Sequence, residues 1–115
     1  MFFSSPVVAA TSSVSNLNAD QFETEVLKSD KPVLVGFTAR WSAFGTQAQM
    51  QLEDIANTYP DEVKVYAIDI DDRPDLVEKY DVNAIPNVLG FKGGSKSGQY
   101  IGPTTTKDTY LRLVK

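Results

Sequence analysis

Two short apolar runs joined by a helix-length segment constrain the fold of this chain more than any other feature. The runs "VLVGF" (33–37) and "VKVYAIDI" (63–70) are apolar at most positions, as in parallel strands that are covered on both faces. Between them, apolar residues recur at helical spacing until Pro60. A strand, a helix and a second strand in this order predict an α/β fold.

The flanking segments extend this alternation. Asn18 followed by Gln21 predicts a capping box at the start of a first helix, which should end before Pro32. Pro74 suits the first turn of a third helix, because its missing N–H is not needed there. Upstream of the first helix, residues 7–14 are the predicted first strand.

The C-terminal part of the chain changes to a hairpin. "NVLGFK" (87–92) and "GQYIG" (98–102) are separated only by "GGSKS", which is too short for a crossover helix. The last two strands are therefore predicted to be antiparallel. Thr105 with Asp108 then predicts the cap of a terminal helix. Together the elements predict a mixed central sheet with helices on both faces.

Length and composition indicate one soluble domain. The chain has 115 residues, of which 42% are hydrophobic and 23% are charged. We expect residues 14–115 to form this domain and residues 1–13 to be an N-terminal tail or the start of the first strand. Since no apolar run approaches the roughly 20 residues that span a bilayer, the chain is not predicted to be transmembrane. The N-terminal segment lacks the basic residues of targeting peptides, and we expect a cytoplasmic or stroma-like organellar location.

The absence of two residue types excludes much chemistry. The chain has no cysteine and no histidine, which removes disulfides, thiolate nucleophiles, imidazole bases and the common zinc ligands. The net charge of −4, with lysine and arginine scattered singly, disfavours nucleic acid or an anionic membrane as a partner. We expect no cofactor and no metal.

The turn "RWSAFG" (40–45) lies between a predicted strand and a predicted helix, where α/β proteins usually carry their sites. Its only hydroxyl is that of Ser42, which we interpret as a helix N-cap before any catalytic role. We expect Trp41 and Phe44 to be exposed and to bind a partner, although packing into the core is the alternative.

The acidic segment "DIDDRPD" (69–75) superficially suggests a calcium loop. An EF-hand loop beginning at Asp69 would need glycine at its sixth position and glutamate at its twelfth, where this chain has Pro74 and Tyr80. We therefore interpret the segment as a solvated turn whose acids lie favourably at a helix N-terminus.

Several of these segments together resemble the thioredoxin family. The similarity rests on "KPVLVGF" leading into "RWSAFG" and a long helix, on "DID", "YDVNAIP" and "FKGG", and on Gly102. It covers nearly the whole chain from about residue 14 onward. The resemblance implies the thioredoxin fold, with a mixed central sheet flanked by helices on both faces.

The same resemblance implies that the family's redox chemistry has been lost. The two positions of its Cys-x-x-Cys pair fall on Ser42 and Gly45, its buried aspartate falls on Gly36, and the neighbouring lysine falls on Ala67. Without a thiolate there is no nucleophile for disulfide exchange. The chain is therefore predicted to be a redox-inactive relative.

What the resemblance preserves is a binding surface. It implies a cis peptide bond at Ile85–Pro86 that faces the turn, where family members hold extended peptides. The expected function is non-covalent binding of a protein or peptide, by a monomer or weak dimer. The predicted binding residues are Trp41, Ser42, Ala43, Phe44, Ile85, Pro86 and Gly102.

Two alternatives remain open. Ser42 could activate glutathione or a similar thiol, as serine does in some relatives of this fold, giving a transferase-like activity. The chain could also be a purely structural subunit that makes no use of the turn.

Overall fold

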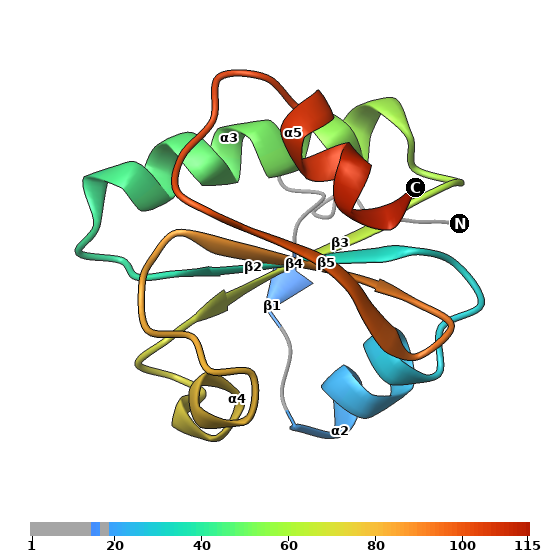
Figure 1. Cartoon of the computed structure of the whole chain (residues 1–115), viewed down its shortest axis with the longest axis horizontal. Coiled ribbons are helices and arrows are strands. Elements are labelled where there is room, and N and C mark those ends of the chain that lie inside the picture. Colours follow the sequence, from blue (N-terminus) through green and yellow to red (C-terminus); the bar gives the residue numbers. More distant parts are fainter. Residues whose placement is uncertain (1–14, 17–18) are drawn as a thin grey trace, which may run out of the picture.

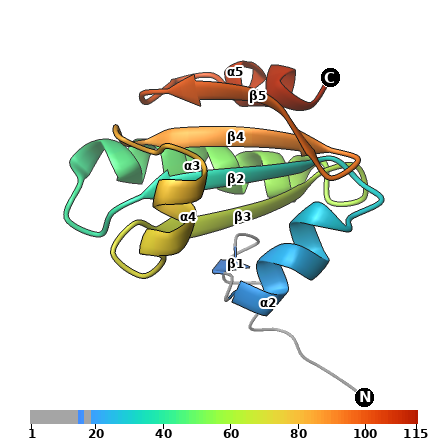
Figure 2. The same cartoon turned by 60° about the horizontal axis from the view of Figure 1, so that its bottom comes forward.

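A five-stranded mixed sheet forms the centre of the computed structural model, which describes residues 15–16 and 19–115. The strand order across the sheet is β1-β3-β2-β4-β5, and Figure 2 shows this order from bottom to top. The strands are β1 (Ser15–Asn16), β2 (Val33–Thr38), β3 (Lys64–Asp69), β4 (Asn87–Lys92) and β5 (Ser95–Ile101).

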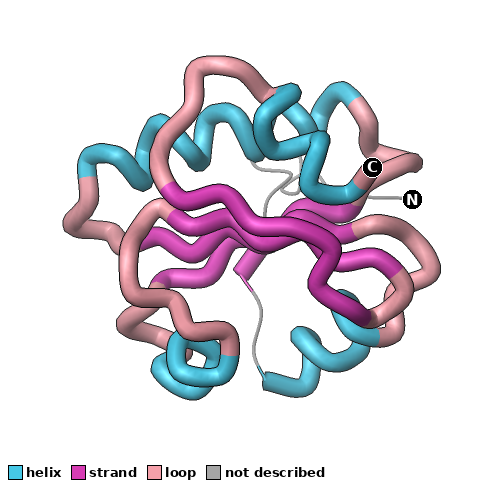
Figure 3. Tube along the Cα trace, viewed as in Figure 1, coloured by secondary structure: helices cyan, strands magenta, loops and turns pink. Residues whose placement is uncertain are grey.

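The sheet is mixed because its two halves run differently. β1 and β2 each pair with β3 in parallel, whereas β4 is antiparallel to β2 and β5 is antiparallel to β4. Figure 3 shows the strands together at the centre, with helices on both sides of them. This arrangement confirms the predicted mixed sheet. It also confirms the antiparallel pairing of the last two strands.

Helices cover both faces of the sheet (Figure 1). One face carries α3 and the C-terminal helices, and the other carries α4 and the N-terminal helical segment. The central strand β2 is buried at every position from Val33 to Phe37, as expected for a strand covered on both sides. The helices are α2 (Ala19–Phe22), the π-helical η1 (Glu23–Leu27), α3 (Ala43–Thr58), α4 (Pro74–Lys79), α5 (Asp108–Leu111) and the 3-10 helix η2 (Arg112–Val114).

The predicted start of the last strand was wrong. β5 begins at Ser95 rather than at Gly98, because Gly93 and Gly94 alone reverse the chain. Both glycines have positive φ values, +62° and +85°, which side-chain-bearing residues rarely adopt. Ser95 can therefore pair directly with Lys92.

The predicted cap of the terminal helix was also wrong. α5 begins at Asp108 after Lys107, and no side chain among the described residues caps it. The hydroxyl of Thr104 instead accepts a hydrogen bond from the Thr106 backbone N–H at 3.2 Å, within the preceding loop. The capping residue Asn18 and the first strand predicted within residues 7–14 lie outside the described residues.

The fold gathers three connections at one end of the sheet. The turn after β2, the loop before β4 and the loop after β5 all leave the sheet at its left end in Figure 1. This end contains the turn that the sequence singled out. The described residues include no helix that is long and apolar enough to cross a membrane.

Candidate functional site

Ser42 fixes the start of the helix that follows the turn. β2 ends at Thr38, and α3 begins at Ala43 with Ser42 as its N-cap. The Ser42 Oγ accepts a hydrogen bond from the Gly45 backbone N–H at 3.3 Å, which confirms the predicted capping role. The Ser42 backbone N–H donates to the Ala39 carbonyl at 2.9 Å and closes the turn.

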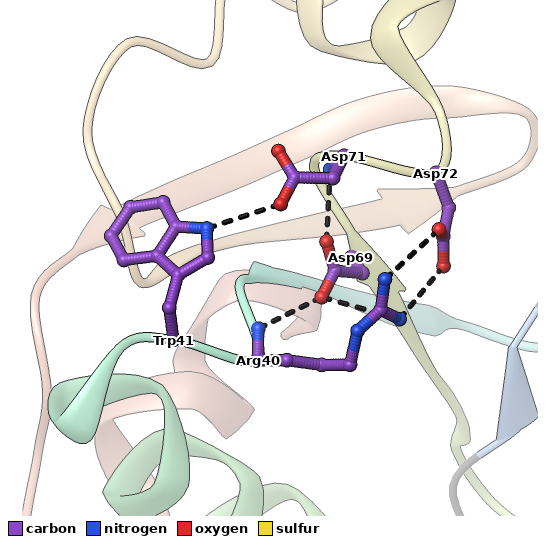
Figure 4. A network of polar contacts seen from close by, with 5 residues as sticks. All are labelled: Arg40, Trp41, Asp69, Asp71 and Asp72. Carbon is purple, nitrogen blue, oxygen red and sulfur yellow. Dashed lines mark hydrogen bonds and ion pairs between the residues drawn. The ribbon is translucent and has the colours of Figure 1, made fainter.

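Two aromatic side chains extend from this turn into solvent. Trp41 is 69% exposed and Phe44 is 62% exposed, which confirms that neither packs into the core. The Trp41 indole N–H donates to a carboxylate oxygen of Asp71 at 3.1 Å, so the indole is held from one edge (Figure 4). Neighbouring exposed aromatic side chains are a feature that interaction sites often have.

Asp69, the last residue of β3, ties the turn to the neighbouring strand. One of its carboxylate oxygens accepts the Arg40 backbone N–H at 2.8 Å, and the other accepts the Asp71 backbone N–H at 2.9 Å (Figure 4). Burial by itself raises the pKa of Asp69, but the two backbone N–H groups and the Arg40 guanidinium outweigh it and lower the pKa below its ordinary value.

Arg40 neutralises part of the acidic segment. Its guanidinium nitrogens lie 3.2 and 3.3 Å from the Asp72 carboxylate and 3.6 Å from Asp69. The expectation of a solvated acidic turn was wrong for Asp69, which is only 7% exposed because the Arg40 and Asp71 backbones close over it. Asp71 and Asp72 are exposed, as expected.

The loops before β4 and after β5 meet at Pro86. The Ile85–Pro86 peptide bond is cis. The Gly102 backbone N–H donates to the Pro86 carbonyl at 2.7 Å, and its φ of +117° is one that glycine adopts readily. The Tyr110 hydroxyl donates to the Gly102 carbonyl at 3.2 Å and anchors this loop on the terminal helix. Pro86 is buried, Ile85 is half-buried and the neighbouring Ile101 is 51% exposed.

The space beside Gly36 and Gly45, two positions where the family resemblance predicts redox side chains, is already filled by other residues. A Cβ atom added at Gly36 would lie 2.5 Å from the Leu52 Cδ1 atom, so Leu52 fills the space that a larger residue would need. A Cβ atom at Gly45 would lie 3.2 Å from the Thr38 Cβ atom. Side chains at these positions would force their neighbours to move.

Ala67 has a different environment. It lies beside a cavity of about 370 Å³ between α3 and the ends of β2 and β3. Neither Trp41 nor Phe44 contributes to this cavity. The lining residues are Thr38, Ala39, Arg40, Gly45, Thr46, Gln49, Met50, Glu53, Ala67 and Asp69.

The turn carries few chemical reagents. The sequence has no thiol and no imidazole, and the Ser42 hydroxyl accepts the helix-capping hydrogen bond. Within residues 15–16 and 19–115, no group of three or more acidic residues is arranged to hold a metal ion. The arrangement is therefore suited to recognition through exposed aromatic surface.

Sequence reasoning missed the Asp69 network and the cavity. The period of two along a strand places Asp69 on the same face as Ala67, toward α3, and this signal was available. The cavity had no such signal, because it depends on which residues of α3 lie opposite β3.

A mixed sheet, a helix that begins at an exposed turn, and a cis-proline loop beside that turn define a protein of the thioredoxin-like class. A profile of the family described as "Thioredoxin" matches residues 13–114. The chain belongs to the thioredoxin family.

Individual relatives agree with this assignment. A protein named thioredoxin from Rickettsia bellii is 39% identical over 88 residues, covering 76% of this chain and 84% of the relative. "Thioredoxin M4, chloroplastic" from Arabidopsis thaliana is 35% identical over 94 residues, covering 82% of this chain and 49% of the relative. The crystal structure of a thioredoxin from Malassezia sympodialis superposes with a TM-score of 0.79 at 26% identity, covering 90% of this chain and 93% of the other.

Proposed function

We propose that this chain is a redox-inactive thioredoxin-like protein that binds a peptide or protein partner without a covalent step. The contact surface is the turn face, which comprises Trp41, Ser42, Ala43, Phe44, Ile85, Pro86 and Gly102. Pro86 is buried, so it contributes to this face only by shaping the backbone and not as an exposed side chain. The observation that carries the proposal is the exposure of Trp41 and Phe44 on adjacent parts of one rigid turn. Exposed aromatic side chains contribute most of the binding energy at many protein interfaces.

The loss of redox activity follows from the chemistry of disulfide exchange. The reaction needs a thiolate to attack a substrate disulfide and a second thiol to resolve the mixed disulfide. Ser42 and Gly45 hold the corresponding positions, and no cysteine exists elsewhere in the chain. Purified protein supplied with a thiol reductant should reduce insulin no faster than a buffer blank.

The rigidity of the turn face favours binding. Trp41 is held by Asp71, Ser42 caps α3, and Gly102 is joined to Pro86 by a hydrogen bond of 2.7 Å. A surface that is already ordered loses little conformational entropy when a partner binds. Ile101, beside Gly102, adds exposed apolar surface next to this face.

The serine-based and the purely structural alternatives each predict results that differ from those of the proposed function. A glutathione-activating role for Ser42 would use its hydroxyl proton as a donor to the thiol sulfur while the oxygen still accepts the Gly45 N–H, and no contact among the described residues specifically favours that role. A purely structural role would leave Phe44 without influence on binding.

For the cellular compartment, we propose a stroma-like organellar or cytoplasmic location. The chloroplastic name of the Arabidopsis relative is consistent with an organellar location.

A peptide-selection experiment with matched variants tests the proposal. Peptides from a displayed random library would be selected on the wild-type protein and then measured against Phe44→Asp and Gln51→Asp. Gln51 is the matched control, because it is partly exposed on the same helix but lies outside both the turn face and the cavity lining. We expect Phe44→Asp to weaken binding by at least about tenfold, the size of an interface hot spot, and Gln51→Asp to change it little.

The same experiment can reject the proposal. If selection yields no peptide, or if both variants bind equally well, the turn face is not a recognition surface. Glutathione binding should be measured in parallel with wild type and Ser42→Ala. A glutathione affinity that disappears in Ser42→Ala would favour the serine-based alternative instead.

A further inference from the structure

The cavity beside α3 has one wall that follows a single face of the helix. Thr46, Gln49, Met50 and Glu53 recur at helical spacing along this wall. Its other side is formed by the ends of β2 and β3. The cavity is a hollow that is largely open to solvent, and its volume of about 370 Å³ is in the lower part of the range of roughly 300–1,000 Å³ for small-molecule sites.

The lining of this cavity carries more negative charge than positive charge, with Glu53 and Asp69 against Arg40. Arg40 contacts both Asp69 and Asp72, so its positive charge is already matched. Asp69 in turn accepts two backbone N–H groups. Glu53 makes no ion pair and no side-chain hydrogen bond with any described residue. One carboxylate in the cavity therefore lacks a counter-ion from the described part of the chain.

The rest of the lining combines hydrogen-bonding atoms with apolar surface. The hydroxyls of Thr38 and Thr46 and the amide of Gln49 make no side-chain hydrogen bond within residues 15–16 and 19–115. Hydroxyl and amide oxygens accept hydrogen bonds from a charged donor. Ala67 and the exposed Met50 add apolar surface against which a short alkyl chain can pack.

We propose that this cavity is a second binding site, distinct from the turn face, for a slim alkyl chain that ends in an ammonium or guanidinium group. Glu53 is the counter-ion, Thr46 and Gln49 accept the remaining donor hydrogens, and Ala67 and Met50 contact the alkyl part. An anion does not fit, because Glu53 and Asp69 would repel it while the Arg40 guanidinium is engaged.

The small residue at position 67 is what leaves room for the ligand. A long side chain at Ala67 would extend into the cavity that it borders. A free amine and the lysine or arginine side chain of a partner protein have the same chemistry at this site. The test therefore uses one probe for each source.

Amide NMR spectra of the full chain provide the test, with butylammonium, Nα-acetyl-lysine methylamide and neutral butanol as probes. We expect both cations to shift the amide signals of Gly45, Thr46 and Ala67. Glu53→Gln should weaken their binding by about fivefold, the size of a partly exposed ion pair. Asp54→Asn is the matched control, because Asp54 is adjacent on α3 but pairs with Lys107 outside the cavity.

The outcomes distinguish a free amine from a partner's side chain as the ligand, and they can also reject the proposed site. Tighter binding of the lysine derivative would assign the site to a partner's side chain, and tighter binding of butylammonium would assign it to a free amine. Equal shifts with butanol, equal affinity in Glu53→Gln, or no shift at these amides would overturn the proposal. Phe44→Ala, which changes the turn face without adding a charge beside the cavity, should leave the cation affinities unchanged, so this test fails or succeeds independently of the turn face.

Discussion

The interior beneath the turn and the surface of the turn differ in how they treat apolar side chains. In the interior, Leu52 is fully buried and its Cδ1 atom lies where a side chain at Gly36 would begin. On the surface, Trp41 and Phe44 remain exposed. The space beside Gly36 is thus filled by a core side chain, whereas the turn keeps apolar side chains in solvent.

This contrast indicates two different constraints. Burial of apolar area stabilises the folded state by about 25 cal/mol per Å², so the packing of Leu52 against Gly36 contributes to stability. An exposed tryptophan or phenylalanine contributes almost none of this stabilisation. Burial of apolar area therefore explains why a leucine stands at position 52. It does not explain why Trp41 and Phe44 stand in the exposed turn.

The largest predicted effect comes from restoring an acid in the interior. Gly36→Asp places an unpaired carboxylate beside the buried Leu52 side chain, and we expect the free energy of unfolding to fall by about 3–5 kcal/mol. Urea denaturation monitored by circular dichroism measures this loss. A change smaller than about 1 kcal/mol would mean that the interior is not closed at Gly36.

A double variant separates the steric part of this loss from the electrostatic part. Leu52→Ala removes the atom that lies 2.5 Å from the added Cβ position. If steric conflict contributes, Gly36→Asp combined with Leu52→Ala should be more stable than the sum of the single effects by about 1 kcal/mol or more. Strict additivity would assign the whole loss to the buried charge.

The next largest effect concerns the link between the two regions. In Asp69→Asn, one of the two carboxylate oxygens becomes an NH₂ donor that faces a backbone N–H of Arg40 or Asp71. We expect a loss of about 1–3 kcal/mol at neutral pH in urea denaturation. The exposed Asp72→Asn is the control, and its effect should stay within about 0.5 kcal/mol.

The pH dependence of this loss has a definite sign. The pKa of Asp69 in the folded protein lies below its ordinary value of 3.8, so its stabilisation is fully present above pH 3.8. It disappears as the pH falls through the lower pKa of the folded state. The difference between wild type and Asp69→Asn should therefore shrink in acid, and a constant difference from pH 7 to pH 2 would contradict the role of the ionised carboxylate.

The parts of the molecule that the sequence predicted are those set by neighbouring residues. The apolar run 33–37 identified β2, and Ser42 followed by a helical pattern identified the cap of α3. In both cases the residues that determine the structure lie within one turn or one strand. The mixed sheet followed from the length of the connections, which is also local.

The missed features depend on contacts between distant residues. The Asp69 side chain and the Arg40 backbone are 29 positions apart in the chain, and their contact turned an expected solvated acid into a buried one. The cavity is lined by residues of both α3 and β3, among them Gly45 and Ala67. The early start of β5 was missed for a different reason, because the serines after Gly94 resemble loop residues although they pair as a strand.

A smaller effect tests whether Ser42 belongs to the structural region. Ser42→Ala removes the oxygen that accepts the Gly45 N–H at the N-terminus of α3, and we expect a loss of about 1 kcal/mol. Ser42→Asn supplies another capping oxygen and should recover most of it. Thermal unfolding of the three proteins measures this, and an unchanged melting temperature in Ser42→Ala would free Ser42 for another role.

The smallest stability effect is predicted for the most exposed residues. Phe44→Asp should change the free energy of unfolding by less than about 0.5 kcal/mol, because Phe44 is 62% exposed and buries little area. An aspartate in the first turn of α3 is also favourable toward the helix dipole, which offsets the apolar contacts that are lost. Urea denaturation beside Met50→Asp supplies the comparison. If Phe44→Asp lost more than about 1 kcal/mol while Met50→Asp did not, the turn would be part of the packed core and the contrast between the two regions would disappear.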